Sequence, residues 1–220
     1  MVEAIFIGTI IPLLFMLGLL RHSRPVFGCF CWGAVAFLLI YLLSPPLYRL
    51  LGLESEFAFT ATVTGPLLEE MLKSLLVIVI AIFAPRSMIP FLYILGLASG
   101  MGFAIEENLV YLLLHFESAE QSRLLMVLRS LSTCLMHGVA TGLIGYALTW
   151  ARRRSGWERP AIPVLGIAVA SAYHAGFNWT MIEGHTTVAL LAAFVLFVAF
   201  LCLMKQTEGA APETKGTTWE

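Results

Sequence analysis

Charged side chains stand inside apolar stretches of this 220-residue sequence, where each charge costs several kcal/mol in hydrocarbon and so needs a reason to be there. The first group is Glu69, Glu70 and Lys73, in which either carboxylate can reach the lysine at helical spacings of three or four residues. Two adjacent carboxylates with one ammonium leave an uncompensated negative charge, which favours a metal ion, a proton or a titrating catalytic group. Because the two glutamates point about 100° apart on a helix, we expect only one of them to face a shared centre. A buried ion pair that fixes helix packing is the alternative.

Three further groups of polar residues follow along the sequence. They are Phe103 with Glu106, Glu107 and Asn108, the isolated His137, and His174 with Asn178. The first of these groups lies near the end of an apolar stretch, so its alternative is simple hydration at the membrane surface. A lone histidine in a buried helix is usually a packed core residue, but two histidines accompanied by intramembrane carboxylates indicate a site.

Carboxylates and imidazoles in a partly dry cavity can activate water. A buried glutamate can take a proton from water, while a histidine or an asparagine stabilises the oxyanion. The same side chains can hold zinc and leave one position open for water. Either arrangement hydrolyses a peptide bond without a serine or cysteine nucleophile. The sequence shows no serine-centred triad and no compact zinc spacing of the HExxH type.

The composition indicates that membrane helices position these groups. Hydrophobic residues make up 59% of the chain and charged residues 12%, with a formal net charge of -1, whereas roughly a quarter of the residues are charged in soluble domains. This excludes a soluble globular protein and a disordered chain. The absence of a basic stripe argues against a nucleic-acid partner, and the four cysteines, all within apolar runs, predict no disulfide framework. The sequence therefore predicts an all-α, polytopic transmembrane bundle.

Seven stretches are long and apolar enough to cross a bilayer, which takes about 20 residues. They are residues 4–20, 26–43, 57–84, 90–115, 124–150, 161–182 and 186–204. We expect Ser44, Pro45 and Pro46 to end the second stretch. The third either continues through Gly65 and Pro66 or begins at Pro66, because proline is favoured in the first turn of a helix.

We expect residues 1–204 to form one transmembrane domain with a catalytic core at 57–182, followed by a polar tail at 205–220. Orientation follows from the basic residues, which collect in cytoplasmic segments. With the N-terminus outside and the C-terminus in the cytoplasm, cytoplasmic segments hold Arg21, Arg24, Arg86, Arg152, Arg153, Arg154, Arg159, Lys205 and Lys215, and external segments hold Arg49 and Arg123. A helical rise of about 1.5 Å per residue then places one layer of groups in the outer half of the bilayer or near its midplane. This layer comprises Glu70, Glu107, His137 and His174.

The ordered set of motifs resembles the PrsW family of intramembrane proteases. The motifs are Glu69-Glu70-x-x-Lys73, Phe103-x-x-x-Glu107-Asn108, His137 and His174-x-x-x-Asn178, and they cover about half of the chain, from Pro66 to Asn178. That family is similar to the CAAX prenyl endopeptidases, their bacterial Abi relatives and the scaffold subunit of gamma-secretase. The CAAX-type enzymes carry an arginine and a histidine where this sequence has Lys73 and Glu107, which favours PrsW.

The resemblance implies an intramembrane endopeptidase of glutamic or metallo type in the inner membrane of a bacterium. Its substrates would be membrane-anchored proteins such as anti-sigma factors, cut near the extracytoplasmic membrane face. Glu69 and Glu70 are implied as the catalytic pair, with Glu70 as general base and Lys73 holding Glu69. The resemblance also implies His137 and His174 as metal ligands or oxyanion stabilisers, Glu107 as a third ligand, Asn178 as an oxyanion donor, and Phe103 and Asn108 as supporting residues. Zinc is the cofactor to expect if a metal takes part.

Two other functions stay open at this point. A non-catalytic membrane scaffold, related to the gamma-secretase subunit, would use the polar groups to hold helices or a partner together. A proton-coupled transporter would use them as a proton relay, although the sequence shows no inverted repeat. The oligomeric state is not indicated by the sequence.

Overall fold

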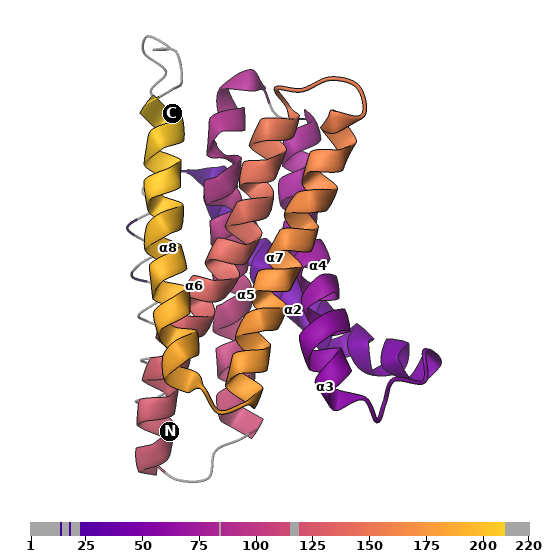
Figure 1. The fold of residues 1–220 in the computed structure, drawn as a ribbon, viewed down its shortest axis with the longest axis vertical. Helices are drawn as coiled ribbons and strands as arrows, with labels where there is room; N and C mark the ends of the chain where they lie inside the picture. Colours follow the sequence, from indigo (N-terminus) through magenta and orange to yellow (C-terminus); the bar gives the residue numbers. More distant parts are fainter. Residues whose placement is uncertain (1–13, 15–17, 19–22, 84, 115–118, 210–220) are drawn as a thin grey trace.

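The computed structural model describes residues 14, 18, 23–83, 85–114 and 119–209, and the regular secondary structure of this part of the chain is all helical. Its elements are α2 (Arg24–Leu50), α3 (Phe57–Phe59), the π-helix η1 (Thr60–Thr64), α4 (Gly65–Phe83), the 3₁₀ helix η2 (Arg86–Phe91), α5 (Leu92–Leu114), α6 (Ala119–Ala151), α7 (Glu158–Ile182) and α8 (Thr186–Gly209). The long helices run side by side as a bundle (Figure 1). The expected all-α bundle is confirmed.

Five helical segments in the described part are long and apolar enough to cross a membrane: Arg24–Leu50, Met88–Tyr111, Ser132–Ala151, Glu158–Ile182 and Thr186–Lys205. Large apolar side chains such as Leu42, Leu165 and Val195 are exposed on the outside of the bundle, as a surface that faces lipid requires. Helix α4, the third expected span, is also long but carries three charged residues. The first expected span, 4–20, lies almost wholly outside the described residues.

Helices α5 and α6 form the centre of the bundle. They pack against each other and are mostly buried, whereas α2, α7 and α8 present most of their surface to the surroundings. Gly96 and Gly100 of α5 lie against the backbone of α6 at Thr141 and His137, where an added Cβ atom would collide with the backbone carbonyls. Such close approach is typical of a pair of small residues four positions apart on a membrane helix. It brings His137 close to the residues of α5.

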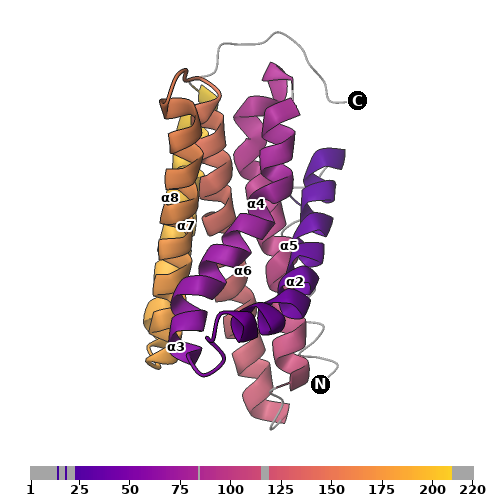
Figure 2. The ribbon, with the colours of Figure 1, turned by 90° about the vertical axis from the view of Figure 1, so that its right-hand side faces the viewer.

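The expectation that Ser44, Pro45 and Pro46 end the second span is wrong. Helix α2 continues through both prolines to Leu50. A proline inside a helix removes a hydrogen bond and bends the helix without having to end it. Figure 2 shows the resulting bend: the last turns of α2 lie across the end of the bundle.

The third span is continuous, since helical structure runs from Phe57 to Phe83. Its geometry changes at η1, where the backbone amide of Gly65 donates to the carbonyl of Thr60, five residues back. A Cβ atom on Gly65 would lie 2.6 Å from the oxygen of Thr60, so glycine suits this position. Pro66 follows without an amide hydrogen, and the π turn accommodates it inside the helix.

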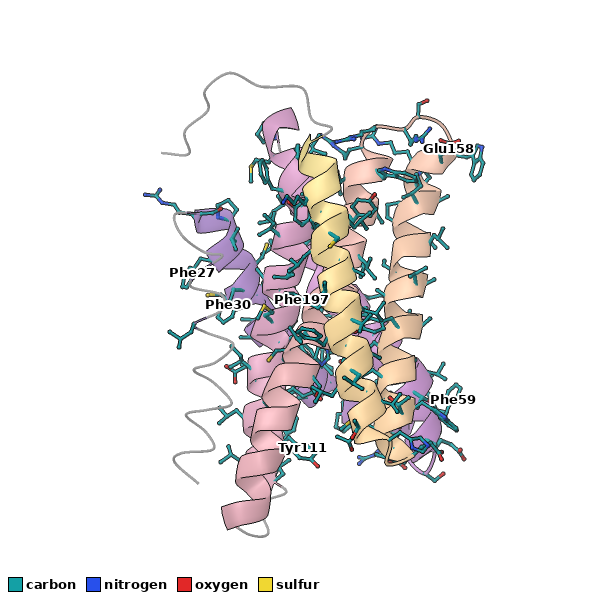
Figure 3. The ribbon with its side chains drawn as sticks, turned by 60° about the vertical axis from the view of Figure 1, so that its left-hand side comes forward. Phe27, Phe30, Phe59, Tyr111, Glu158 and Phe197 are labelled. Carbon is teal, nitrogen blue, oxygen red and sulfur yellow. The ribbon has the colours of Figure 1, made fainter. Side chains whose placement is uncertain are left out.

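The two ends of the bundle differ in charge. Figure 3 places Glu158 at one end and Phe59 and Tyr111 towards the other. Next to Glu158, the connection between α6 and α7 carries Arg152, Arg153 and Arg154, and Arg159 follows in the first turn of α7.

Candidate active site

Helix α4 supplies the two glutamates and the lysine of the site. Nζ of Lys73 lies 2.5 Å from Oε1 of Glu70 and 3.9 Å from Oε2 of Glu69. Glu70 and Lys73 are fully buried, while 19% of the Glu69 side chain is exposed. Lys73 therefore pairs mainly with Glu70, whereas the sequence suggested Glu69.

His137 projects from α6 between two charged partners. Its Nδ1 atom lies 2.7 Å from Nζ of Lys73, and its Nε2 atom lies 2.7 Å from Oε2 of Glu107 on α5. An ammonium group can only donate and an ionised carboxylate can only accept. The contacts therefore assign the ring proton to Nε2, with Nδ1 as the acceptor.

His174 brings α7 to the same place. Its Nδ1 atom lies 3.1 Å from Oε1 of Glu70, and its Nε2 atom lies 3.8 Å from Oε2 of Glu69. The rings of His174 and His137 meet edge to face, with centroids 4.7 Å apart. The hydrogen bond to Glu70 assigns the proton to Nδ1, so Nε2 offers its lone pair on the side of Glu69. Both neighbouring glutamates thus reach the centre, whereas we expected only one.

Glu70 is the most heavily bonded group of the site. In addition to Lys73 and His174 on Oε1, the hydroxyl of Thr141 donates to its Oε2 atom over 2.9 Å. Ser99 donates to the backbone carbonyl of Lys73 over 2.8 Å. Sequence reasoning missed Ser99 and Thr141. The position of Thr141, one helical turn after His137 on the same face, was an available signal.

The supporting residues have separate roles. Phe103 places its ring 4.5 Å from Nζ of Lys73 and 5.2 Å from the ring of His137. Asn108 joins α5 to α6, because its Oδ1 atom accepts a hydrogen bond from Thr133. Asn178 donates to the backbone carbonyl of Ala61 in η1, over 2.8 Å. The structure therefore brings Phe103 to the charged centre and shows both asparagines in contacts between helices.

A pocket of about 440 Å³ opens beside the charged centre. Glu69, Phe103 and Glu107 line one side of it, and residues of α2 line the other. Glu107 is one-third exposed there, whereas Glu70 is fully buried. The carboxylates that can meet a substrate are therefore those of Glu69 and Glu107.

Glu69, His137 and His174 form a group that can hold a metal ion, since one donor atom from each lies within 4.8 Å of the others. Two histidines and one glutamate are the donor set of known catalytic zinc sites. Zinc–ligand distances of about 2.1 Å separate such donors by about 3.4 Å. The 3.8 Å between His174 Nε2 and Glu69 Oε2 is close to that spacing, and the three donor atoms, which lie up to 4.8 Å apart, would draw together on binding an ion. Glu107, the carboxylate expected in this set, lies 2.7 Å from Nε2 of His137.

The sequence matches the PrsW family of intramembrane metalloproteases over residues 22–204. The chain belongs to this family. The comparison with curated proteins gave no match, and neither did the comparison with solved structures.

Membership of the PrsW family makes the chain a peptide hydrolase of the membrane. The buried histidines and glutamate described above agree with a metalloprotease, because the family name and the donor set both imply a metal ion. The match also covers every described helix that contributes to the site.

Proposed function

We propose that this PrsW protein cuts membrane-anchored proteins within the outer half of the bilayer, using water activated by glutamate and a zinc ion. The observation that carries the proposal is the meeting of Glu69, His137 and His174 beside a pocket that also holds Glu107. This arrangement combines a metal-donor set with a second, partly exposed carboxylate.

Each residue then has a distinct task. Glu69, His174 and His137 would hold the zinc ion, His137 through the Nδ1 lone pair that accepts from Lys73 in the structure, so the ion would displace the Lys73 ammonium from that nitrogen. The ion would lower the pKa of bound water and polarise the peptide carbonyl. Glu70 is a positioning residue, because its hydrogen bond to Nδ1 fixes the orientation of His174 and leaves Nε2 for ligation. Glu107 is then the carboxylate left to accept a proton in the pocket.

The reaction balances as an ordinary peptide hydrolysis. Glu107 takes a proton from water, and the water oxygen bonds to the carbonyl carbon of the substrate. The carbon–nitrogen bond then breaks, and the proton from Glu107 passes to the leaving amine. This assignment moves the role of general base from Glu70, our choice from the sequence, to Glu107.

The membrane setting favours an extracytoplasmic position of the site. Glu70 precedes the end of α4 by thirteen residues and His137 precedes the end of α6 by fourteen, or about 20 Å at the helical rise. Those helix ends lie on the arginine-rich side of the bundle, which the positive-inside rule assigns to the cytoplasm. A single-span protein of the anti-sigma-factor kind would therefore be cut towards its outer end.

The test uses the purified protein in detergent with a panel of single-span substrates and mass spectrometry of the products. We expect cleavage by the wild type that stops after chelation and returns with zinc, and none by Glu69→Gln or His174→Ala. Glu106→Gln is the matched control for Glu69→Gln, because it makes the same chemical change at a glutamate that is not one of the proposed metal ligands. Cleavage by both site variants at the wild-type rate would refute the proposal. A folded wild type without any cleavage, together with loss of thermal stability in both variants, would support the scaffold alternative.

A further inference from the structure

We propose that α2 forms a subsite that takes one large apolar side chain of the substrate beside the scissile bond; this rests on the proposed function. The pocket next to Glu69 and Glu107 is closed on its other side by α2, through Phe37, Ile40, Tyr41, Ser44 and Pro45. We call these five residues the α2 wall. The pocket's volume of about 440 Å³ lies in the range of ligand pockets, roughly 300–1,000 Å³.

The α2 wall is one face of a helix. Counted from Phe37, its other members lie three, four, seven and eight residues on, which places them in one stripe. Phe37 is buried and packs edge to face on Phe103, with centroids 5.3 Å apart, and Phe103 in turn contacts His137. Tyr41 is half exposed. The wall therefore joins the charged centre at one end and remains accessible at the other.

The surroundings of the α2 wall indicate an apolar occupant. The wall holds no charged side chain, and the carboxylates of the pocket come from α4 and α5. Beside the wall, Leu38, Leu42 and Leu43 are 49%, 66% and 57% exposed on the outside of α2. The pocket thus adjoins an apolar outer surface, so a transmembrane segment in the bilayer can place a side chain into it from the side. A charged side chain would find no partner on this wall.

The bend of α2 adds a polar element to the same wall. Proline has no amide hydrogen, so Pro45 cannot donate to the carbonyl of Tyr41, four residues earlier. Both residues line the pocket, and the carbonyl of a helical residue points towards the residue four positions on. The Tyr41 carbonyl is therefore placed to accept a hydrogen bond from the substrate backbone, which needs partners wherever it is extended inside a membrane.

Two matched substitutions test the subsite. Ile40→Trp narrows the pocket, whereas Leu42→Trp adds the same bulk to the exposed side of α2. We measure kcat/KM for single-span substrates that differ only in phenylalanine or alanine next to the cut bond. We expect Ile40→Trp to lower the preference for phenylalanine on the order of tenfold, and Leu42→Trp to leave it unchanged. An unchanged preference in Ile40→Trp would overturn the subsite.

The carbonyl is tested by a second matched pair. Pro45→Ala restores the amide donor for Tyr41, whereas Pro46→Ala restores one for Leu42, which does not line the pocket. We expect kcat/KM to fall about fivefold for all substrates in Pro45→Ala, the value of one hydrogen bond, with little change in Pro46→Ala. Equal losses in both variants would assign the effect to the bend of the helix and would overturn the role of the carbonyl.

A binding experiment separates this inference from the proposed function. A single-span leucine-rich peptide with benzoylphenylalanine near its outer end is photocrosslinked to the zinc-loaded protein, and the crosslinked residues are mapped. Crosslinks to Ile40 or Tyr41 without any cleavage of the substrate panel would support the subsite while the proposed hydrolysis fails. Cleavage with crosslinks only at lipid-facing residues such as Val79 would overturn the subsite and leave the hydrolysis standing. Absence of both crosslinks and cleavage would overturn both.

Discussion

The side-chain amide of Asn178 donates a hydrogen bond to the backbone carbonyl of Ala61, across 2.8 Å between α7 and η1. The backbone cannot supply this donor. The amide of Gly65, four residues on, bonds to Thr60 instead, and Pro66, five residues on, has no amide hydrogen. Asn178 thus completes the π turn at the start of α4 and ties it to the helix that carries the second histidine of the site.

This contact predicts that Asn178 acts through the structure of the site. Asn178→Ala and Asn178→Asp both lack the donor, so we expect both to lower the free energy of unfolding by about 1 kcal/mol and to weaken zinc binding. Thermal unfolding and zinc titration measure the two effects. An oxyanion donor would behave differently, since its loss lowers kcat about 10²–10³-fold with stability unchanged. That second pattern would contradict the positioning role.

Changing each of the two carboxylates that line the pocket to an amide is expected to affect zinc content and kcat differently. Glu69→Gln removes a proposed metal ligand, so we expect zinc content and cleavage to fall together. Glu107→Gln should keep its zinc and lower kcat about 10²–10⁴-fold, as expected for the loss of a general base. Elemental analysis beside steady-state kinetics checks the split. Glu107→Gln without zinc would make Glu107 a ligand and return the role of base to another carboxylate.

The helical bundle and the set of polar residues could be predicted from the sequence, because membrane helices need long apolar stretches and intramembrane charges need a reason. The use of both adjacent glutamates could not. Their directions on α4 differ by about 100°, yet His174 reaches Glu70 with one ring nitrogen and approaches Glu69 with the other. That arrangement depends on how α7 crosses α4, and the hydrophobic periodicity of the sequence does not predict the angle at which two helices cross. The role of Asn178 could not be predicted for the same reason, since its side chain bonds to a backbone carbonyl in the π-helix η1, a different segment of the chain.

The ion pair of Lys73 and Glu70 is expected to govern stability. Both side chains are fully buried, and removing one partner of such a pair leaves a charge without compensation, which costs about 3–5 kcal/mol. We expect Lys73→Met to lower the thermal midpoint strongly and Lys73→Met with Glu70→Gln to recover part of the loss. Arg49→Ala is the control, since its pair with Glu54 is largely exposed and contributes about 0–1 kcal/mol. Equal effects of Lys73→Met and Arg49→Ala would show that the buried pair has no special weight.

The contact of α5 with α6 gives a prediction that links packing to catalysis. A Cβ atom on Gly100 would collide with the backbone carbonyl of His137, so Gly100→Ala must push the two helices apart next to a proposed metal ligand. We expect a loss of about 1–3 kcal/mol in stability from this overpacking, together with weaker zinc binding. Gly28→Ala is the matched control, because nothing lies within 4 Å of its added Cβ and alanine favours the helix by about 1 kcal/mol. Thermal unfolding and zinc titration of both variants distinguish the two positions. Full zinc affinity in Gly100→Ala would show that the spacing of the helices does not set the position of His137. The hydrogen bonds of His137 to Lys73 and Glu107 would then be what holds its ring in place.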